Sequence, residues 1–200
     1  MKKITTRILS LILMVGLVFA LVSCGSAKTF TRGKTTGNTY KSDFLGLSFT
    51  KPGDWYFYSD DQIAQLLGTT TEILNDTAAF EAAAETQLID FMAATEDGTN
   101  NVNVTFVKGS MVTQVDASID ATMDTMKKEY EHLGGTCTVS AKTERQLGKV
   151  AFTEVTMTVS AGIVKMNQFC YFCKIGNTLV NIVCTSATGT TMEDFEAMFS

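Results

Sequence analysis

Histidine is nearly absent from the sequence, which has only His132 in 200 residues. Because histidine is the usual general base and the commonest metal ligand, a single copy excludes two-histidine metal sites within one chain and leaves His132 as the one histidine that a Ser-His-Asp or Cys-His site could use. The sequence also lacks a Gly-x-Ser-x-Gly motif and a phosphate-binding glycine loop. The sequence does not exclude a catalytic pair of carboxylates of the kind used in glycoside hydrolysis, because the two members of such a pair come from distant positions in a chain.

Basic residues are scarce once the first 23 residues are set aside. Lys2, Lys3 and Arg7 lie in that segment, which has no acidic residue, and the rest of the chain has 13 basic and 21 acidic side chains. The resulting formal charge, near −8, repels phosphate backbones and offers no polybasic patch to a membrane. Nucleic acid is therefore not an expected partner, and any membrane attachment needs another origin.

The one long apolar run begins at Ile8 and ends at Val22. As a helix it would measure about 22 Å, which is shorter than the roughly 30 Å hydrocarbon core of a bilayer. A basic segment followed by a short apolar run and then small residues is typical of a secretory signal peptide. We therefore expect residues 1–23 to direct export and then to be removed.

Cys24 follows this run in the order Leu21-Val22-Ser23-Cys24. These four residues resemble the lipobox of bacterial lipoproteins, in which the cysteine receives a diacylglyceryl group and the signal peptide is cut off just before it. The resemblance implies that Cys24 is the lipid-attachment site and the first residue of the mature protein. Two or more acyl chains, such as palmitate, on one cysteine give stable anchoring without help from the protein surface.

Residues 24–39 are rich in Gly, Thr, Ser and Lys and show no periodicity. We interpret them as a flexible tether. Residues 40–200 have a globular composition, with neither an internal repeat nor a second linker. They are expected to form one domain.

Alternating apolar residues predict strands in this domain. Residues 40–50 are expected to form two short strands around a turn. The other expected strands cover residues 88–95, 101–108, 136–145, 149–159, 163–175 and 178–185. A hairpin turn at residues 96–99 and a two-residue turn at Gly176-Asn177 join neighbouring strands. The sheet should therefore be largely antiparallel and twisted, with helices packed on it, which is an α+β fold.

Helices are predicted where apolar residues recur at spacings of three and four. A capping box at Ser59 and Gln62 starts one helix, which Gly68 ends, and residues 71–86 are helical with a break near Asn75. The longest helix covers residues 116–133, and a short one covers residues 191–199. The apolar stripe of the longest helix consists of Val115, Ile119, Met123, Met126, Tyr130 and Leu133.

The order of these elements resembles the PsbP-like family, which includes the extrinsic photosystem II subunit, a nuclear-import factor that binds a small GTPase, and several bacterial envelope lipoproteins. The matching residues are Tyr40, Leu45-Gly46-Leu47-Ser48-Phe49 and Pro52-Gly53-Asp54-Trp55. The long helix, the four-stranded meander and the terminal helix match as well. The resemblance implies an α/β/α sandwich and a role in binding or scaffolding, but no partner, because members bind unrelated molecules.

Cys170 and Cys173 have the spacing of a redox motif, but they fall in a predicted strand. Residues three apart on a strand point to opposite faces and lie about 10 Å apart, which is too far for a disulfide. Pairing across Gly176-Asn177 places neither of them, nor Cys184, opposite another cysteine. We therefore expect buried thiols at these positions and at Cys137, although a bridge from Cys137 to one of the others stays open in an oxidising compartment.

The remaining polar groups have structural interpretations. Asp60-Asp61, Glu96-Asp97 and Glu193-Asp194 lie where a helix starts or a hairpin turns, so capping and solvation account for them. His132 falls in the last turn of the longest helix, where the helix dipole favours a cation. The methionines of that helix fit core filling better than an adaptable binding groove. No ligand set for a metal or a cofactor is evident.

Together these features predict a lipid-anchored module on the extracytoplasmic face of the cell membrane that binds a protein partner and has no catalytic activity. The alternatives are an envelope hydrolase with dispersed carboxylates and a carrier or sensor of a small ligand. Two convergent, unpaired carboxylates in a deep cleft would favour the hydrolase. A filled core with one exposed apolar patch would favour the binding module.

Overall fold

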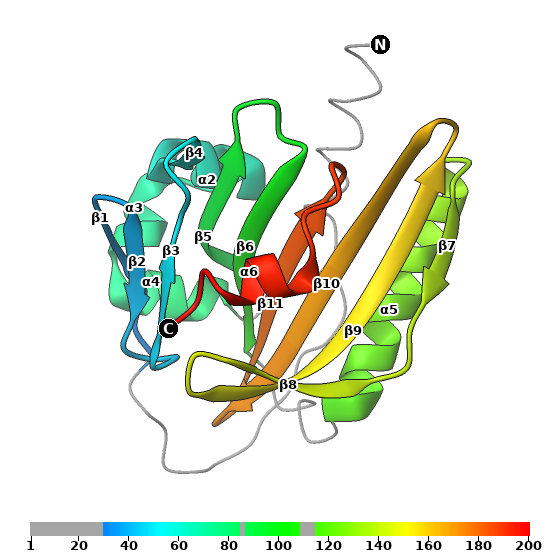
Figure 1. The fold of residues 1–200 in the computed structure, drawn as a ribbon. Coiled ribbons are helices and arrows are strands. Elements are labelled where there is room, and N and C mark those ends of the chain that lie inside the picture. Colours follow the sequence, from blue (N-terminus) through cyan, green and yellow to red (C-terminus); the bar gives the residue numbers. More distant parts are fainter. Residues whose placement is uncertain (1–29, 85–86, 109–114) are drawn as a thin grey trace.

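The structure is a computed structural model that describes residues 30–84, 87–108 and 115–200. Its centre is an antiparallel eight-stranded sheet in the order β4-β5-β6-β11-β10-β9-β7, in which β8 also pairs with β9 (Figure 1). A second sheet has three strands in the order β1-β2-β3. These antiparallel sheets with a few helices confirm the predicted α+β class.

The strands of the small sheet are β1 (Lys34–Thr36), β2 (Thr39–Ser42) and β3 (Leu47–Thr50). Those of the large sheet are β4 (Trp55–Phe57), β5 (Leu88–Thr95), β6 (Asn100–Lys108), β7 (Thr136–Val139), β8 (Thr143–Leu147), β9 (Val150–Ala161), β10 (Val164–Ile175) and β11 (Thr178–Ser186). The helices are α2 (Asp60–Leu67), α3 (Thr71–Asn75), α4 (Thr77–Ala83), α5 (Val115–His132) and α6 (Met192–Glu196).

The turn between β10 and β11 fixes the register of the meander. Gly176 has a φ of 62°, a conformation that favours glycine. Pairing across this turn sets Cys170 opposite Val183 and Cys184 opposite Phe169. The predicted register is therefore confirmed, and it brings no two of these cysteines face to face.

Local capping signals determine where the short helices begin. The Ser59 side chain accepts a hydrogen bond from the Gln62 backbone N–H, and the Gln62 side chain accepts one from the Ser59 backbone N–H. The predicted break near Asn75 is also present, because Asp76 ends α3 and its side chain accepts from the Ala79 N–H to begin α4. Each cap satisfies backbone donors that a helix start leaves unpaired.

Two apolar cores lie on opposite faces of the large sheet. Alternate residues of β11 show the division, since Val180, Ile182 and Cys184 pack into the first core. Leu179 and Val183 pack into the second core, which α5 covers. Figure 1 shows β1–β3 with α2–α4 at one end of the large sheet and α5 along β7 and β9 at the other.

The packed domain begins before Tyr40. Phe30 is 6% exposed, and its ring lies 5.1 Å from that of Phe44 and 5.2 Å from that of Phe106. Lys34–Thr36 then forms β1, which pairs with β2. This differs from the tether predicted for residues 24–39, because three aromatic neighbours bury Phe30 and β2 supplies a partner for the segment that follows it.

Two further details differ from the prediction. The strand expected over residues 136–145 is two strands, β7 and β8, which pair with successive parts of the long strand β9. Leu133, expected on the buried stripe of the longest helix, is 48% exposed because α5 ends at His132. In the part of the chain that the structure describes, no helix has the length and apolar character needed to cross a membrane.

Candidate functional site

A buried carboxylate lies at an irregularity in β5. Ile89 pairs with Thr105 and Phe91 with Val104, so Asp90 is an extra residue that has no partner on β6. Such a bulge redirects a side chain out of the regular alternation. The Asp90 side chain has 0% exposure, and it points toward the segment that precedes β1.

The partners of Asp90 come from the N-terminal segment and from β2. The backbone N–H of Gly33 donates to both carboxylate oxygens at 3.1 Å, and the Tyr40 hydroxyl donates to Oδ2. Arg32 Nε lies 3.6 Å from Oδ1, and Arg32 Nη2 donates to Asp60 Oδ1 at 2.7 Å and to the Asp90 carbonyl at 3.2 Å. We call these five residues, Arg32, Gly33, Tyr40, Asp60 and Asp90, the Asp90 cluster.

Glycine is required at position 33 by close approach. A Cβ atom on Gly33 would lie 2.2 Å from Cε2 of the Tyr40 ring, far inside van der Waals contact. The same closeness lets the Gly33 N–H reach the carboxylate of Asp90. The sequence around the cluster is therefore constrained by packing as well as by charge.

Burial sets the protonation behaviour of the cluster. It raises the pKa of Asp90 to about 6, although the bonds from Tyr40 and Gly33 and the charge of Arg32 act in the opposite direction. Burial and the neighbouring Asp90 raise the pKa of Tyr40, which therefore stays a donor. The bond from Arg32 lowers the pKa of Asp60. Chemically, the cluster can take up a proton near pH 6, and it joins the start of the domain to the large sheet.

We expect the contribution of Asp90 to stability to decline as the pH rises from about 4 to about 7. Its pKa is about 6 in the folded protein and about 4 in an unfolded chain. The folded state thus holds the extra proton. The stability that comes from this proton is fully present below pH 4 and is lost above pH 6, whereas the bonds from Gly33 and Tyr40 to Asp90 contribute at every pH. Two pKa units correspond to about 3 kcal/mol.

Urea unfolding between pH 4 and 7.5, followed by the fluorescence of the buried Trp55, measures this dependence. The variant Asp90→Asn cannot titrate at this position, so its curve should lack that part of the slope. Identical slopes for the two proteins would contradict the assignment.

A cavity of about 550 Å³ adjoins the Asp90 cluster. Its lining includes Arg32, Asp60 and Asp90 together with Tyr58 and Asn75. The charges here already pair with one another, since Arg32 contacts both carboxylates. The cavity could hold a small polar molecule, but its buried acid is occupied by internal bonds.

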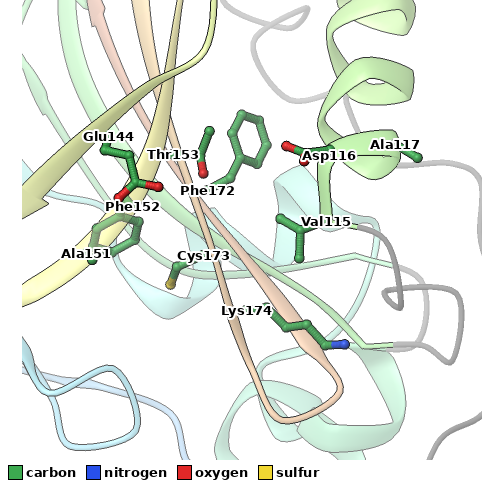
Figure 2. A pocket seen from close by; sticks show the side chains of 10 residues that line it. All are labelled: Val115, Asp116, Ala117, Glu144, Ala151, Phe152, Thr153, Phe172, Cys173 and Lys174. Carbon is green, nitrogen blue, oxygen red and sulfur yellow. The ribbon is translucent and has the colours of Figure 1, made fainter.

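A second cavity, of about 680 Å³, lies between the start of α5 and strands β8 to β10 (Figure 2). Figure 2 shows Asp116 and Glu144 on opposite sides of it, with Lys174 below them. The Asp116 carboxylate is 82% exposed and lies 3.4 Å from Lys142 Nζ. Asp116 therefore does not match the unpaired carboxylate of a deep cleft that would favour a hydrolase.

The sequence-predicted site residue, Cys24, lies outside the described residues. His132 lies in the last turn of α5, as predicted. Cys137, Cys170 and Cys184 are buried thiols, none of them in a disulfide. Cys173, which was also expected to be buried, is partly exposed. Burial raises the pKa of Cys170, which disfavours the reactive thiolate form.

Members of the three acidic pairs singled out in the sequence lie at helix starts and in a turn, as predicted, and one of them also forms an ion pair. Thr191 caps α6, and the Asp194 carboxylate completes the capping box by accepting from the Thr191 N–H. Asp97 accepts from Thr95 and Thr99 in the turn after β5. Asp60 lies in the first turn of α2 and also pairs with Arg32, a contact the sequence did not predict. Among residues 30–84, 87–108 and 115–200, no group of three or more His, Cys, Asp or Glu side chains could hold a metal ion.

Arg32 and Asp90 are the residues that sequence reasoning missed. One signal was present for each. Asp90 is the only charged residue within the apolar run of β5, and an acid there needs a partner if it is buried. Arg32 follows the lone aromatic residue of the presumed tether, Phe30.

Comparisons with known proteins test the fold. No family profile matches the sequence, and no curated protein sequence matches it. The solution structure of cyanobacterial PsbP from Synechocystis is similar over 90% of this chain and 98% of that one, with a TM-score of 0.50 and 13% identity. The fold is PsbP-like.

Another solved structure, a crystal structure from Bacteroides thetaiotaomicron, is similar over 83% of this chain with a TM-score of 0.44 and 13% identity. This chain spans 48% of the length of that protein. At such identities, likeness to the PsbP structure describes the shape of the domain and not its partner. The function of this PsbP-like domain must therefore be argued from its own residues.

Proposed function

We propose that the protein is a lipid-anchored binding or accessory module on the extracytoplasmic face of the cell membrane, without catalytic activity. The proposal rests on one observation, the signal-like run followed by Leu21-Val22-Ser23-Cys24. Cys24 carries the lipid in this proposal, and a protein of the envelope is the partner.

The described domain supports a binding role rather than a hydrolytic one. Its buried acid, Asp90, holds two segments of the chain together through Gly33 and Tyr40. The acid beside the cavity shown in Figure 2, Asp116, is exposed and pairs with Lys142. A carboxylate bound in these ways is a poor general acid or base, because its lone pairs or its charge are already in use.

The variant Cys24→Ala tests the anchor. We expect the wild-type protein in the membrane fraction, because two acyl chains bury many CH₂ groups at about 0.8 kcal/mol each. The variant should either appear in the soluble fraction or keep its signal peptide. Cell fractionation together with mass spectrometry of the purified protein measures both results.

Cys173→Ala is the matched control, since it removes a cysteine from β10 and leaves the lipobox intact. It should remain in the membrane with the mass of a lipidated chain. If Cys24→Ala changes neither the mass nor the membrane retention, the proposed anchor is wrong.

A further inference from the structure

The large sheet ends at β7, and no described strand pairs with the outer edge of β7. It is the last strand in the order β4-β5-β6-β11-β10-β9-β7, and its pairing partner is β9 (Figure 1). An open edge presents unpaired N–H and C=O groups to another chain, and many proteins protect such an edge with lysine, proline or a bulge. The four residues of β7, Thr-Cys-Thr-Val, include neither lysine nor proline, and their register with β9 is regular.

The register shows which backbone groups of β7 are unpaired. Ser140, which follows β7, donates its N–H to the Thr156 carbonyl of β9 at 2.9 Å. Backbone groups alternate in direction along a strand, so the N–H and C=O of Thr138 also face β9. Those of Cys137 and Val139 therefore point away from the sheet, and no hydrogen bond joins them to another described residue.

A groove of about 630 Å³ follows this edge, between β7 and α5. Its floor is apolar, because Met123, Cys137 and Val155 are buried there. Val139 lies on the same face of β7 as Cys137 and is 40% exposed. On the helix side the groove is lined by Asp120, Asp124 and Lys127. The open strand edge is therefore accessible, and a chain placed along it would have apolar contacts on one side and charged groups on the other.

The helix side of the groove is acidic. Asp116 and Asp120 share Lys142, whose Nζ lies 3.4 Å and 2.8 Å from their carboxylates. Lys127 pairs with another acid of α5. Asp124 is exposed and forms no ion pair with a described residue. The charged groups that line the groove or pair with its lining are four acids and two bases, which leaves a formal charge of −2.

We propose that the open edge of β7 binds an extended segment of a partner protein, which pairs with β7 as an additional strand and carries a lysine or arginine toward α5. In this mode of recognition, main-chain hydrogen bonds supply affinity and contacts with alternate side chains supply specificity. A second copy of this chain fits less well, because its own groove has the same negative charge. The site deepens the binding role proposed above and rests on it, but it does not depend on the lipid.

Fluorescence anisotropy with a designed peptide tests the site on the protein purified in detergent. The probe is a fluorescein-labelled nonapeptide of alternating threonine and valine, with lysine in place of one valine. The wild type should bind it saturably. A matched peptide with glutamate in place of the lysine should bind about fivefold more weakly or less, because the groove is acidic.

The variant Val139→Pro removes one of the outward N–H groups. Proline is tolerated on an edge strand where the N–H faces solvent, so the urea midpoint should change little. Peptide affinity should fall about tenfold or more, because the added strand loses a hydrogen bond and its close approach. Val139→Thr keeps the N–H and a branched side chain, so its affinity should stay within about threefold of the wild type. Thr138→Pro is the control on register, and it should lower the urea midpoint because its N–H faces β9.

A charge reversal on α5 tests the same site without altering β7. Asp124→Lys should reverse the preference, so that the glutamate peptide binds more tightly than the lysine peptide. Glu96→Lys is the matched control, since it makes the same change of charge in the exposed turn between β5 and β6. It should leave both affinities within about twofold of the wild type.

Four results would overturn the site. They are no saturable binding of the lysine peptide to the wild type, equal binding to Val139→Pro and the wild type, an unchanged preference in Asp124→Lys, and dimerisation of the wild type in sedimentation velocity that Val139→Pro abolishes. The last result would make a second copy the occupant of the edge. Protein carrying Cys24→Ala should bind the peptide normally, so loss of peptide binding and loss of membrane retention report different failures.

Discussion

Replacing Asp90 by alanine should lower the free energy of unfolding by about 3–5 kcal/mol, the usual cost of removing one partner from a buried charged pair. The change leaves the Gly33 N–H and the Tyr40 hydroxyl without their acceptor. It also leaves Arg32, whose side chain is only 19% exposed, with a single carboxylate partner. Urea unfolding monitored by Trp55 fluorescence measures the loss at pH 7.

Asp60→Ala is the control, because it removes the other carboxylate from the same arginine. The Asp60 side chain is 41% exposed, and exposed ion pairs contribute about 0–1 kcal/mol. A large loss for Asp90→Ala with a small one for Asp60→Ala would assign the stability to the buried member of the Asp90 cluster. Equal losses would refute that assignment.

Phe30→Ala should cost about 3–5 kcal/mol, as truncation of a buried phenylalanine does in other cores. The Phe30 ring lies within 5.1 to 5.4 Å of the rings of Phe44, Phe80 and Phe106. Alanine would leave a cavity among three aromatic side chains from β6, from α4 and from the loop after β2. Urea unfolding again provides the measurement.

Thr35→Ala is the matched control, since Thr35 is in the same segment but is exposed on β1. Its effect should stay within about 0.5 kcal/mol. If Phe30→Ala is also neutral, residues 30–39 do not contribute to the core, and the domain starts at Tyr40 after all.

The meander and the short helices could be predicted because their signals are local. Gly176-Asn177 specifies a two-residue turn, and that turn fixes the register of β10 and β11. Ser59 and Gln62 form a capping box within four residues. In each case the residues that determine the structure are neighbours in the sequence.

The division between β7 and β8 has no such signal. At the break, the Ser140 hydroxyl accepts from the Thr156 N–H, and the Ser140 N–H donates to the Thr156 carbonyl. One serine thus continues the pairing with β9 where the backbone of β7 leaves it. The sequence around Ser140 does not predict this role, because the residue that Ser140 pairs with is 16 positions away.

The same reason explains why the Asp90 cluster and the burial of Asn101 and Asn181 were not predicted. Gly33 and Asp90 are 57 residues apart, and Asn101 meets Thr185 only through the pairing of β6 with β11. A single sequence shows the residue types but not which of them meet. Asn101 and Asn181 in particular look like ordinary residues of a half-exposed strand until burial is known.

The burial of Phe30 changes how far the domain could reach from a lipid on Cys24. Six residues of chain span at most about 20 Å, whereas the 16 residues to Tyr40 would span about 55 Å. With the lipid proposed for Cys24, such a short lead would confine the domain to a thin layer above the bilayer, and this would raise its effective concentration toward partners in the same membrane. Such a domain would diffuse in two dimensions along the membrane surface and would meet its partner there.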